Sequence, residues 1–130
     1  MRLFLTLAAL ALPLPAAAEG ARIVLDCTTQ TRCDPQGGCA SATGSARFTL
    51  APVTTDAGGA GSYSLSLGDG AALEAKAPSR TGPWVWLQGG EVLMTLALSG
   101  ETSAVWIRQS LAGGGSAPAT IDLMTCEVTA

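Results

Sequence analysis

Short runs of alternating apolar and polar residues make up most of the chain after its first twenty positions. In residues 62–67, Tyr63, Leu65 and Leu67 alternate with three serines. Successive side chains of a β-strand point to opposite faces, so this run predicts a strand with one apolar and one hydroxylated face. Related patterns predict seven further strands, at residues 22–28, 45–52, 72–77, 84–88, 91–99, 103–110 and 120–129.

The segments between the predicted strands are typical of turns. Residues 68–70 (Gly-Asp-Gly) and 89–90 (Gly-Gly) suit tight hairpins that need a positive φ, and residues 99–101 suit a slightly longer hairpin. Two connections are longer: the cysteine-containing loop 29–44 and the glycine-rich loop 112–119. This order predicts an all-β protein of about eight antiparallel strands in a meander that closes into a small β-barrel, with a two-sheet β-sandwich as the alternative.

One predicted strand, residues 91–99, is apolar on both faces. Val92 and Met94 lie on its expected inner face, while the opposite face still carries Leu93 and Ala97. Strands that are apolar on both faces are typical of a sheet covered on both sides. The sequence therefore predicts a central strand with a second layer over it.

The N-terminus has the composition of a secretory signal. A positively charged second residue is followed by an apolar run at 3–12 and by the small residues Ala16 and Ala18. A membrane-spanning helix needs about 20 apolar residues, and two prolines end this run earlier. We therefore expect residues 1–18 to be a cleavable signal peptide and residues 19–130 to be a single all-β domain. The protein is then periplasmic or secreted, without a membrane anchor after cleavage.

Four cysteines follow the expected signal, and an even number in an exported chain indicates two disulfide bonds. Residues 34–38 (Asp-Pro-Gln-Gly-Gly) are turn-forming, which favours a bond between Cys33 and Cys39 and leaves Cys27 for Cys126. The pairing of Cys27 with Cys39 and of Cys33 with Cys126 remains open, because spacing does not determine connectivity. Zinc is not expected, because five residues separate successive members of the first three cysteines and Cys126 stands alone, whereas zinc knuckles have two to four residues between their cysteines.

Composition and charge exclude several kinds of chemistry. The chain has no histidine, which removes the commonest general base and the commonest neutral metal ligand. After the expected cleavage, six basic and ten acidic residues remain, and the basic ones are scattered, so we expect no nucleic-acid partner. We also expect no metal or other cofactor. Carboxylates such as Asp26 and Asp122 are the only basis for an enzyme, and we expect them to be solvated charges on strand faces.

Three tryptophans are the most informative side chains. Trp84 and Trp86 point to one side of their predicted strand, and Trp106 lies two strands later. If exposed, they would form a contact surface for a partner. If buried, they would fill the core of a domain rich in alanine and glycine.

Together these observations favour a non-catalytic binding protein that binds or inhibits a protein partner in the periplasm. The segment from Cys33 to Cys39, as a protruding loop, and the three tryptophans, as an apolar rim, are the features that could contact the partner. A small-ligand carrier with its site in the barrel interior is the alternative, followed by an enzyme that works through carboxylates alone. The expected build, a small exported barrel with a disulfide between its terminal strands, resembles periplasmic inhibitors of lysozymes and proteases in architecture alone.

Overall fold

The computed structural model describes residues 20–113 and 118–130, so the expected signal peptide lies outside the described residues. Within these ranges every regular element is a strand, and no helix is long and apolar enough to cross a membrane. The strands are β1 (Ile23–Cys33), β2 (Cys39–Ser41), β3 (Ser45–Thr55), β4 (Gly61–Leu67), β5 (Leu73–Ala77), β6 (Trp84–Gln88), β7 (Val92–Gly100), β8 (Ser103–Ser110) and β9 (Ala119–Thr129).

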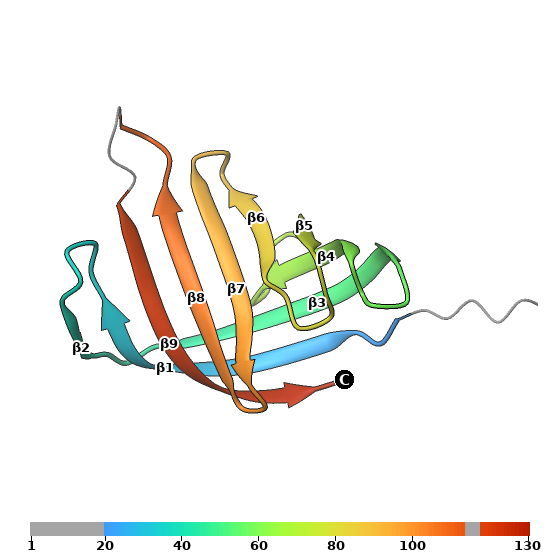
Figure 1. Ribbon diagram of the computed structural model, residues 1–130, viewed down its shortest axis with the longest axis horizontal. Helices are drawn as coiled ribbons and strands as arrows, with labels where there is room; N and C mark the ends of the chain where they lie inside the picture. Colours follow the sequence, from blue (N-terminus) through green and yellow to red (C-terminus); the bar gives the residue numbers. More distant parts are fainter. Residues whose placement is uncertain (1–19, 114–117) are drawn as a thin grey trace, which may run out of the picture.

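The strands form one antiparallel sheet that closes on itself. From β3 to β9 each strand is hydrogen-bonded to the next one along the chain, and β1 is bonded to both β3 and β9. The result is an eight-stranded barrel with β2 as an extra strand beside β1 (Figure 1). The predicted meander barrel is confirmed, and the two-sheet sandwich is excluded.

The glycine-containing segments predicted as turns lie between consecutive strands of the barrel. Residues 68–70 lie in the connection between β4 and β5, and residues 89–90 lie in the connection between β6 and β7. Gly89 and Gly90 adopt φ values of 59° and 76°, a conformation that L side chains rarely adopt. The turn chemistry of the sequence therefore fixes which strands are neighbours.

Alternate side chains of each of the eight barrel strands fill the barrel. In β4, Tyr63 and Leu65 are buried while the serines between them are partly exposed. Two aromatic pairs pack edge to face inside the barrel. The ring centroids of Phe48 and Trp106 are 5.2 Å apart, and those of Tyr63 and Trp84 are 6.1 Å apart. Each such pair contributes about 0.5–1.5 kcal/mol beyond its burial. The remaining buried apolar residues are Leu25, Cys27, Leu50, Ala75, Ala77, Trp86, Met94, Leu96, Ala104, Met124 and Cys126.

The outer face of β7 differs from the prediction. Leu93 and Ala97 point outward and are half-buried, and no second layer covers them in the described part of the chain. The prediction was wrong because a closed barrel is a single layer with one interior. Neighbouring outward side chains shield each other instead, since Leu93 pairs with Leu87 and Ala97 pairs with Val105.

Both favoured disulfides are present. Cys27 and Cys126 are bonded and lie directly opposite each other in the pairing of β1 with β9, inside the barrel. They span 99 positions of sequence, so the loop-entropy model assigns this bond about 4–5 kcal/mol. The bond between Cys33 and Cys39 spans six positions. The first disulfide locks the pair of strands that closes the barrel.

The strands differ most from the prediction in the cysteine-containing loop, residues 29–44. β1 continues to Cys33 instead of ending near residue 28, and β2 was not predicted. Residues 28–32 read Thr-Thr-Gln-Thr-Arg and have no apolar alternation. They are extended because β9 on one side and β2 on the other pair with their backbone.

Candidate functional site

The hairpin formed by β1 and β2 extends beyond the part of the barrel that β3 covers. β1 pairs with β3 as far as Thr28, and from Thr31 to Cys33 the place of β3 is taken by β2. Every residue from 34 to 41 is exposed. Figure 1 places this hairpin at the margin of the molecule, where a partner can reach it.

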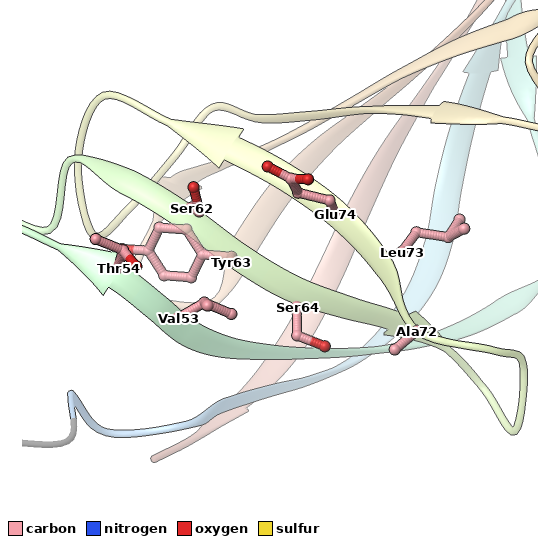
Figure 2. A pocket seen from close by; sticks show the side chains of 8 residues that line it. All are labelled: Val53, Thr54, Ser62, Tyr63, Ser64, Ala72, Leu73 and Glu74. Atoms are coloured by element: carbon pink, nitrogen blue, oxygen red, sulfur yellow. The ribbon is translucent and has the colours of Figure 1, made fainter.

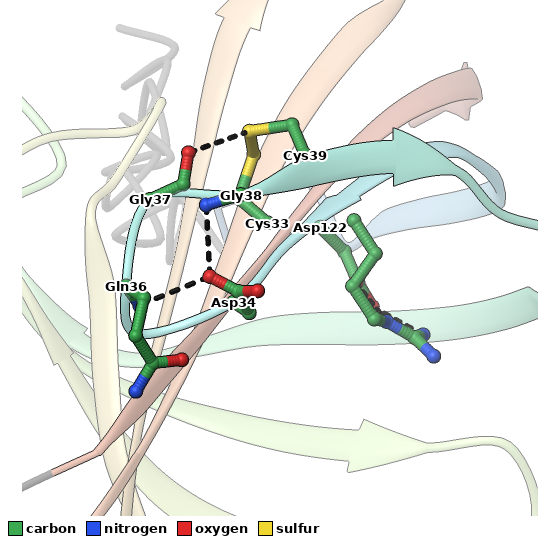
Figure 3. The surroundings of a disulfide bond; sticks show 8 residues. Cys33, Asp34, Gln36, Gly37, Gly38, Cys39 and Asp122 are labelled. Carbon is green, nitrogen blue, oxygen red and sulfur yellow. Dashed lines mark hydrogen bonds and ion pairs between the residues drawn. A yellow bond between two sulfur atoms is a disulfide. The ribbon is translucent and has the colours of Figure 1, made fainter.

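The hairpin tip, residues 33–39, is held in one shape by covalent and hydrogen bonds. A disulfide joins its two ends. Asp34 Oδ1 accepts hydrogen bonds from the backbone N–H groups of Gln36 at 2.9 Å and Gly38 at 2.8 Å (Figure 3). The backbone N–H of Asp34 donates to the Gly38 carbonyl at 2.8 Å. A surface segment that is already ordered loses little conformational entropy on binding.

An ion cluster around a buried carboxylate fastens the base of the hairpin to the barrel. Asp122 of β9 is fully buried, and its carboxylate accepts hydrogen bonds from Arg32 Nε at 2.6 Å and Arg32 Nη2 at 3.0 Å. Arg108 of β8 donates a third bond at 2.7 Å, and its guanidinium lies 4.5 Å from the centre of the Trp106 ring. The hydrogen bond with Asp122 raises the pKa of Arg32 above its ordinary value. Arg32 is therefore charged and fixed in orientation where the hairpin leaves the barrel.

A β-bulge in β1 brings Arg32 to this position. The pairing of β1 with β9 shifts between Thr29 and Thr31, which makes Gln30 an extra residue. An extra residue changes the alternation of side chains between the two faces of the sheet. Thr29 is buried, and Arg32, instead of Thr31, is the next residue to stand opposite an inward-facing residue of β9, Asp122.

The sequence contained one signal of this cluster. Asp122 shares an alternating face of β9 with Met124 and Cys126, and all three are buried. A buried carboxylate is stable only when it is paired, so a charge in an apolar row indicates a buried cationic partner. The expectation of a solvated Asp122 is wrong for this reason, and sequence reasoning missed Arg32 and Arg108 as its partners.

Asp26, the other candidate carboxylate, lies on the outside of the barrel. Its side chain is 49% exposed and lies 3.5 Å from Arg47 Nε. Its neighbour on β3 is Arg47 and its neighbour on β9 is Glu127, while Asp122 faces inward, so Asp26 and Asp122 do not share a site. In the described ranges no group of three or more Cys, Asp or Glu residues could hold a metal ion.

The three tryptophans lie inside the barrel. The exposed fractions of Trp84, Trp86 and Trp106 are 0%, 2% and 9%. Of the two interpretations of the tryptophans, burial in the core is therefore the correct one. The three side chains form no contact surface on the outside of the barrel. Their inward position follows from the alternation along β6 and β8, in which the outward neighbours Val85, Leu87, Val105 and Ile107 remain partly or well exposed.

Among the surface hollows of the described structure, one lies beside the hairpin and another lies on a different part of the barrel. A hollow of about 470 Å³ lies beside the hairpin and is lined by Arg32, Asp34 and the small residues of the β2 region. Another, of about 360 Å³, lies over β3, β4 and β5, where Ser62, Ser64 and Glu74 surround it (Figure 2). The second hollow is lined by apolar side chains such as Val53 and Leu73 as well as by these polar groups, whereas the first adjoins the rigid hairpin tip.

Comparison of the chain with protein-family models, curated proteins and solved structures finds no match. The candidate site is therefore defined by geometry alone. It consists of the hairpin tip, the hollow beside it and the Arg32–Asp122–Arg108 cluster at its base.

Proposed function

We propose that the protein is an exported, non-catalytic binding protein that contacts a protein partner through the hairpin tip, and that it inhibits the partner where the contact covers the partner's site. The observation that carries this proposal is a fully exposed segment that is nevertheless braced by a disulfide and by the Asp34 hydrogen bonds. Tight protein inhibitors use preorganised segments of this kind, because little entropy remains to be lost.

An exported location is part of the proposal. Two disulfides are compatible with folding in an oxidising compartment, and the N-terminal sequence has the features of a secretory signal. Disulfides are rare in reducing compartments. A periplasmic or secreted partner is therefore the one to seek.

A small ligand in the barrel interior is less well supported. Sites for such ligands have volumes of about 300–1,000 Å³. The interior positions of this barrel carry large side chains, among them Trp84, Trp86, Phe48 and Tyr63, that are at most 2% exposed. These large side chains take up interior space that such a ligand would need.

The test is capture of a partner from periplasmic extract on the immobilised oxidised protein, with two matched variants. Gln36→Arg places a large cation on the exposed tip, and Thr102→Arg does the same on the exposed turn between β7 and β8. We expect Thr102→Arg to retain the partner and Gln36→Arg to lose at least nine-tenths of it. Equal retention by the two variants, or the absence of any specifically captured protein, would contradict the proposal.

A further inference from the structure

The backbone of the β1–β2 hairpin follows the antiparallel alternation of hydrogen bonds. Asp34 N–H donates to the Gly38 carbonyl at 2.8 Å, so these residues are a hydrogen-bonded pair. Ala42 N–H donates to the Gln30 carbonyl at 3.1 Å, which makes a second such pair. In an antiparallel ladder, hydrogen-bonded pairs alternate with pairs that are not hydrogen-bonded.

The alternation assigns the pairs in between. Cys33 stands opposite Cys39 and Thr31 opposite Ser41, and both are non-hydrogen-bonded pairs. The Cα atoms of Cys33 and Cys39 are 4.1 Å apart, near the ~4.5 Å expected for a pair of this type. In such pairs the N–H and C=O groups point away from the partner strand. On β1 they point to β9, and on β2 they point to a side where the described chain has no strand.

The outer edge of β2 is therefore a free strand edge. It carries the N–H and C=O groups of Cys39 and Ser41, two residues apart, which is the spacing at which an incoming strand forms its hydrogen bonds. All three residues of β2 are exposed, and Figure 1 shows β2 at the margin of the molecule. The barrel strands each have neighbours on both sides, although β5 and β6 meet at the single pair Lys76 and Val85.

We propose that the outer edge of β2 binds an extended segment of the protein partner by strand addition. This inference rests on the proposed function and specifies how the partner is held. Main-chain hydrogen bonds to Cys39 and Ser41 supply the attraction, and the hollow of about 470 Å³ beside the edge receives a side chain of the added strand. Gly38, which has no side chain, and Ala40 and Ala42, which have small ones, border this hollow, so the added backbone can approach closely.

An extended segment of another protein fits this edge better than a second copy of the chain. β2 has three residues, so two copies paired through β2 would share only a short ladder. The chain also has a formal charge of −3, which disfavours association with itself. A partner segment pairs with the same three residues, but it need not carry this negative charge and it can place a side chain in the hollow beside the edge.

The test uses peptides selected from a display library of random 12-residue sequences on the oxidised protein. Ser41→Pro removes the outward N–H without removing a bond to β1, and Ser41→Ala keeps that N–H while removing the hydroxyl. We expect selected peptides to bind Ser41→Ala within twofold of the unmodified protein and Ser41→Pro at least tenfold more weakly. Hydrogen–deuterium exchange on the unmodified protein should show peptide protection of the Cys39 and Ser41 amides, a readout independent of whether Ser41→Pro folds.

Several results would overturn the inference. These are equal binding of the peptides to Ser41→Pro, failure to select any peptide, and protection confined to the β5–β6 pair or the outer face of β7. Self-association of the unmodified protein that Ser41→Pro abolishes would assign the edge to a second copy instead. If Gln36→Arg abolishes capture of the partner and Ser41→Pro does not, the proposed function stands but strand addition is wrong. If peptides bind the β2 edge but no partner is captured, strand addition stands but the proposed function is wrong.

Discussion

Replacing Asp122 by asparagine tests whether the ion cluster holds the hairpin to the barrel. The substitution keeps the shape of the side chain and removes the charge that accepts three hydrogen bonds from two arginines. Breaking a fully buried ion pair by removing one partner costs about 3–5 kcal/mol. The side chains of Arg32 and Arg108 are 45% and 29% exposed, so part of their charge can return to water. We therefore expect a loss of about 2–3 kcal/mol in the free energy of unfolding.

The measurement is urea unfolding of the oxidised protein followed by tryptophan fluorescence, since the three tryptophans are core residues. Asp26→Asn is the matched control, because Asp26 pairs with Arg47 on the outside and both side chains are about half exposed or more. We expect this control to change the unfolding free energy by less than about 1 kcal/mol, as is usual for exposed pairs. Most of the Asp122→Asn effect should persist in 1 M salt, because the carboxylate is buried even though its arginine partners are partly exposed, and buried charges are screened little.

The hairpin provides a second readout of the same substitution. Arg32 lies one residue before the disulfide-bonded tip, so loss of its carboxylate partner should loosen the base of the hairpin. We expect faster amide exchange at residues 30–33 in Asp122→Asn than in Asp26→Asn. The reasoning is refuted if the two variants are equally stable, or if Asp122→Asn is destabilised while its hairpin amides exchange as in the unmodified protein.

Three further predictions follow from the core and the strand pairing. Burial raises the pKa of Tyr63, the only tyrosine, so the Tyr63 hydroxyl ionises at a lower pH in the unfolded chain than in the folded one, and the free energy of unfolding should fall as the pH rises past about 10. Urea unfolding at pH 9 and pH 11 should show a smaller fall for Tyr63→Phe, and an identical fall would contradict this prediction. Replacing Cys27 and Cys126 together by alanine and valine should lower the free energy of unfolding by about 4–5 kcal/mol, and replacing Cys33 and Cys39 by serines should lower it by about 2 kcal/mol. Equal losses measured by calorimetry would contradict the loop-entropy model. Amides of β5 and β6 at their shared border should exchange faster than those of β1 and β9, and the reverse order would show that this border is not the weak one.

The barrel could be predicted from the sequence because two local signals agree along the chain. Period-two alternation marks strands such as residues 62–67, and glycines such as Gly89 and Gly90 mark the turns between them. The same turn chemistry gave the Cys33–Cys39 bond and, by elimination, the Cys27–Cys126 bond. These features depend on residues close in sequence, apart from the last bond.

The candidate site was predicted only in part, because it depends on contacts between distant residues. The exposed loop at residues 34–38 was recognised from its composition, but its strand β2 was not. The bulge at Gln30 leaves no mark in a run of threonines, and without it Arg32 would be expected on the outer face. The partners of Asp122 lie 90 and 14 positions away in sequence, so only its position in an apolar row pointed to them.

The most strongly fastened part of the barrel is also the part that carries the proposed binding segment. β1 and β9 pair continuously from Val24 to Cys33, apart from the bulge, and they are joined by the Cys27–Cys126 disulfide and by the ion pair of Arg32 with Asp122. β5 and β6, by contrast, share a single residue pair. Local opening should therefore begin at β5 and β6 and leave the hairpin in place. A tip mounted on the β1–β9 pair keeps its shape between encounters, and this explains why a braced loop on a closed barrel suits binding by preorganisation.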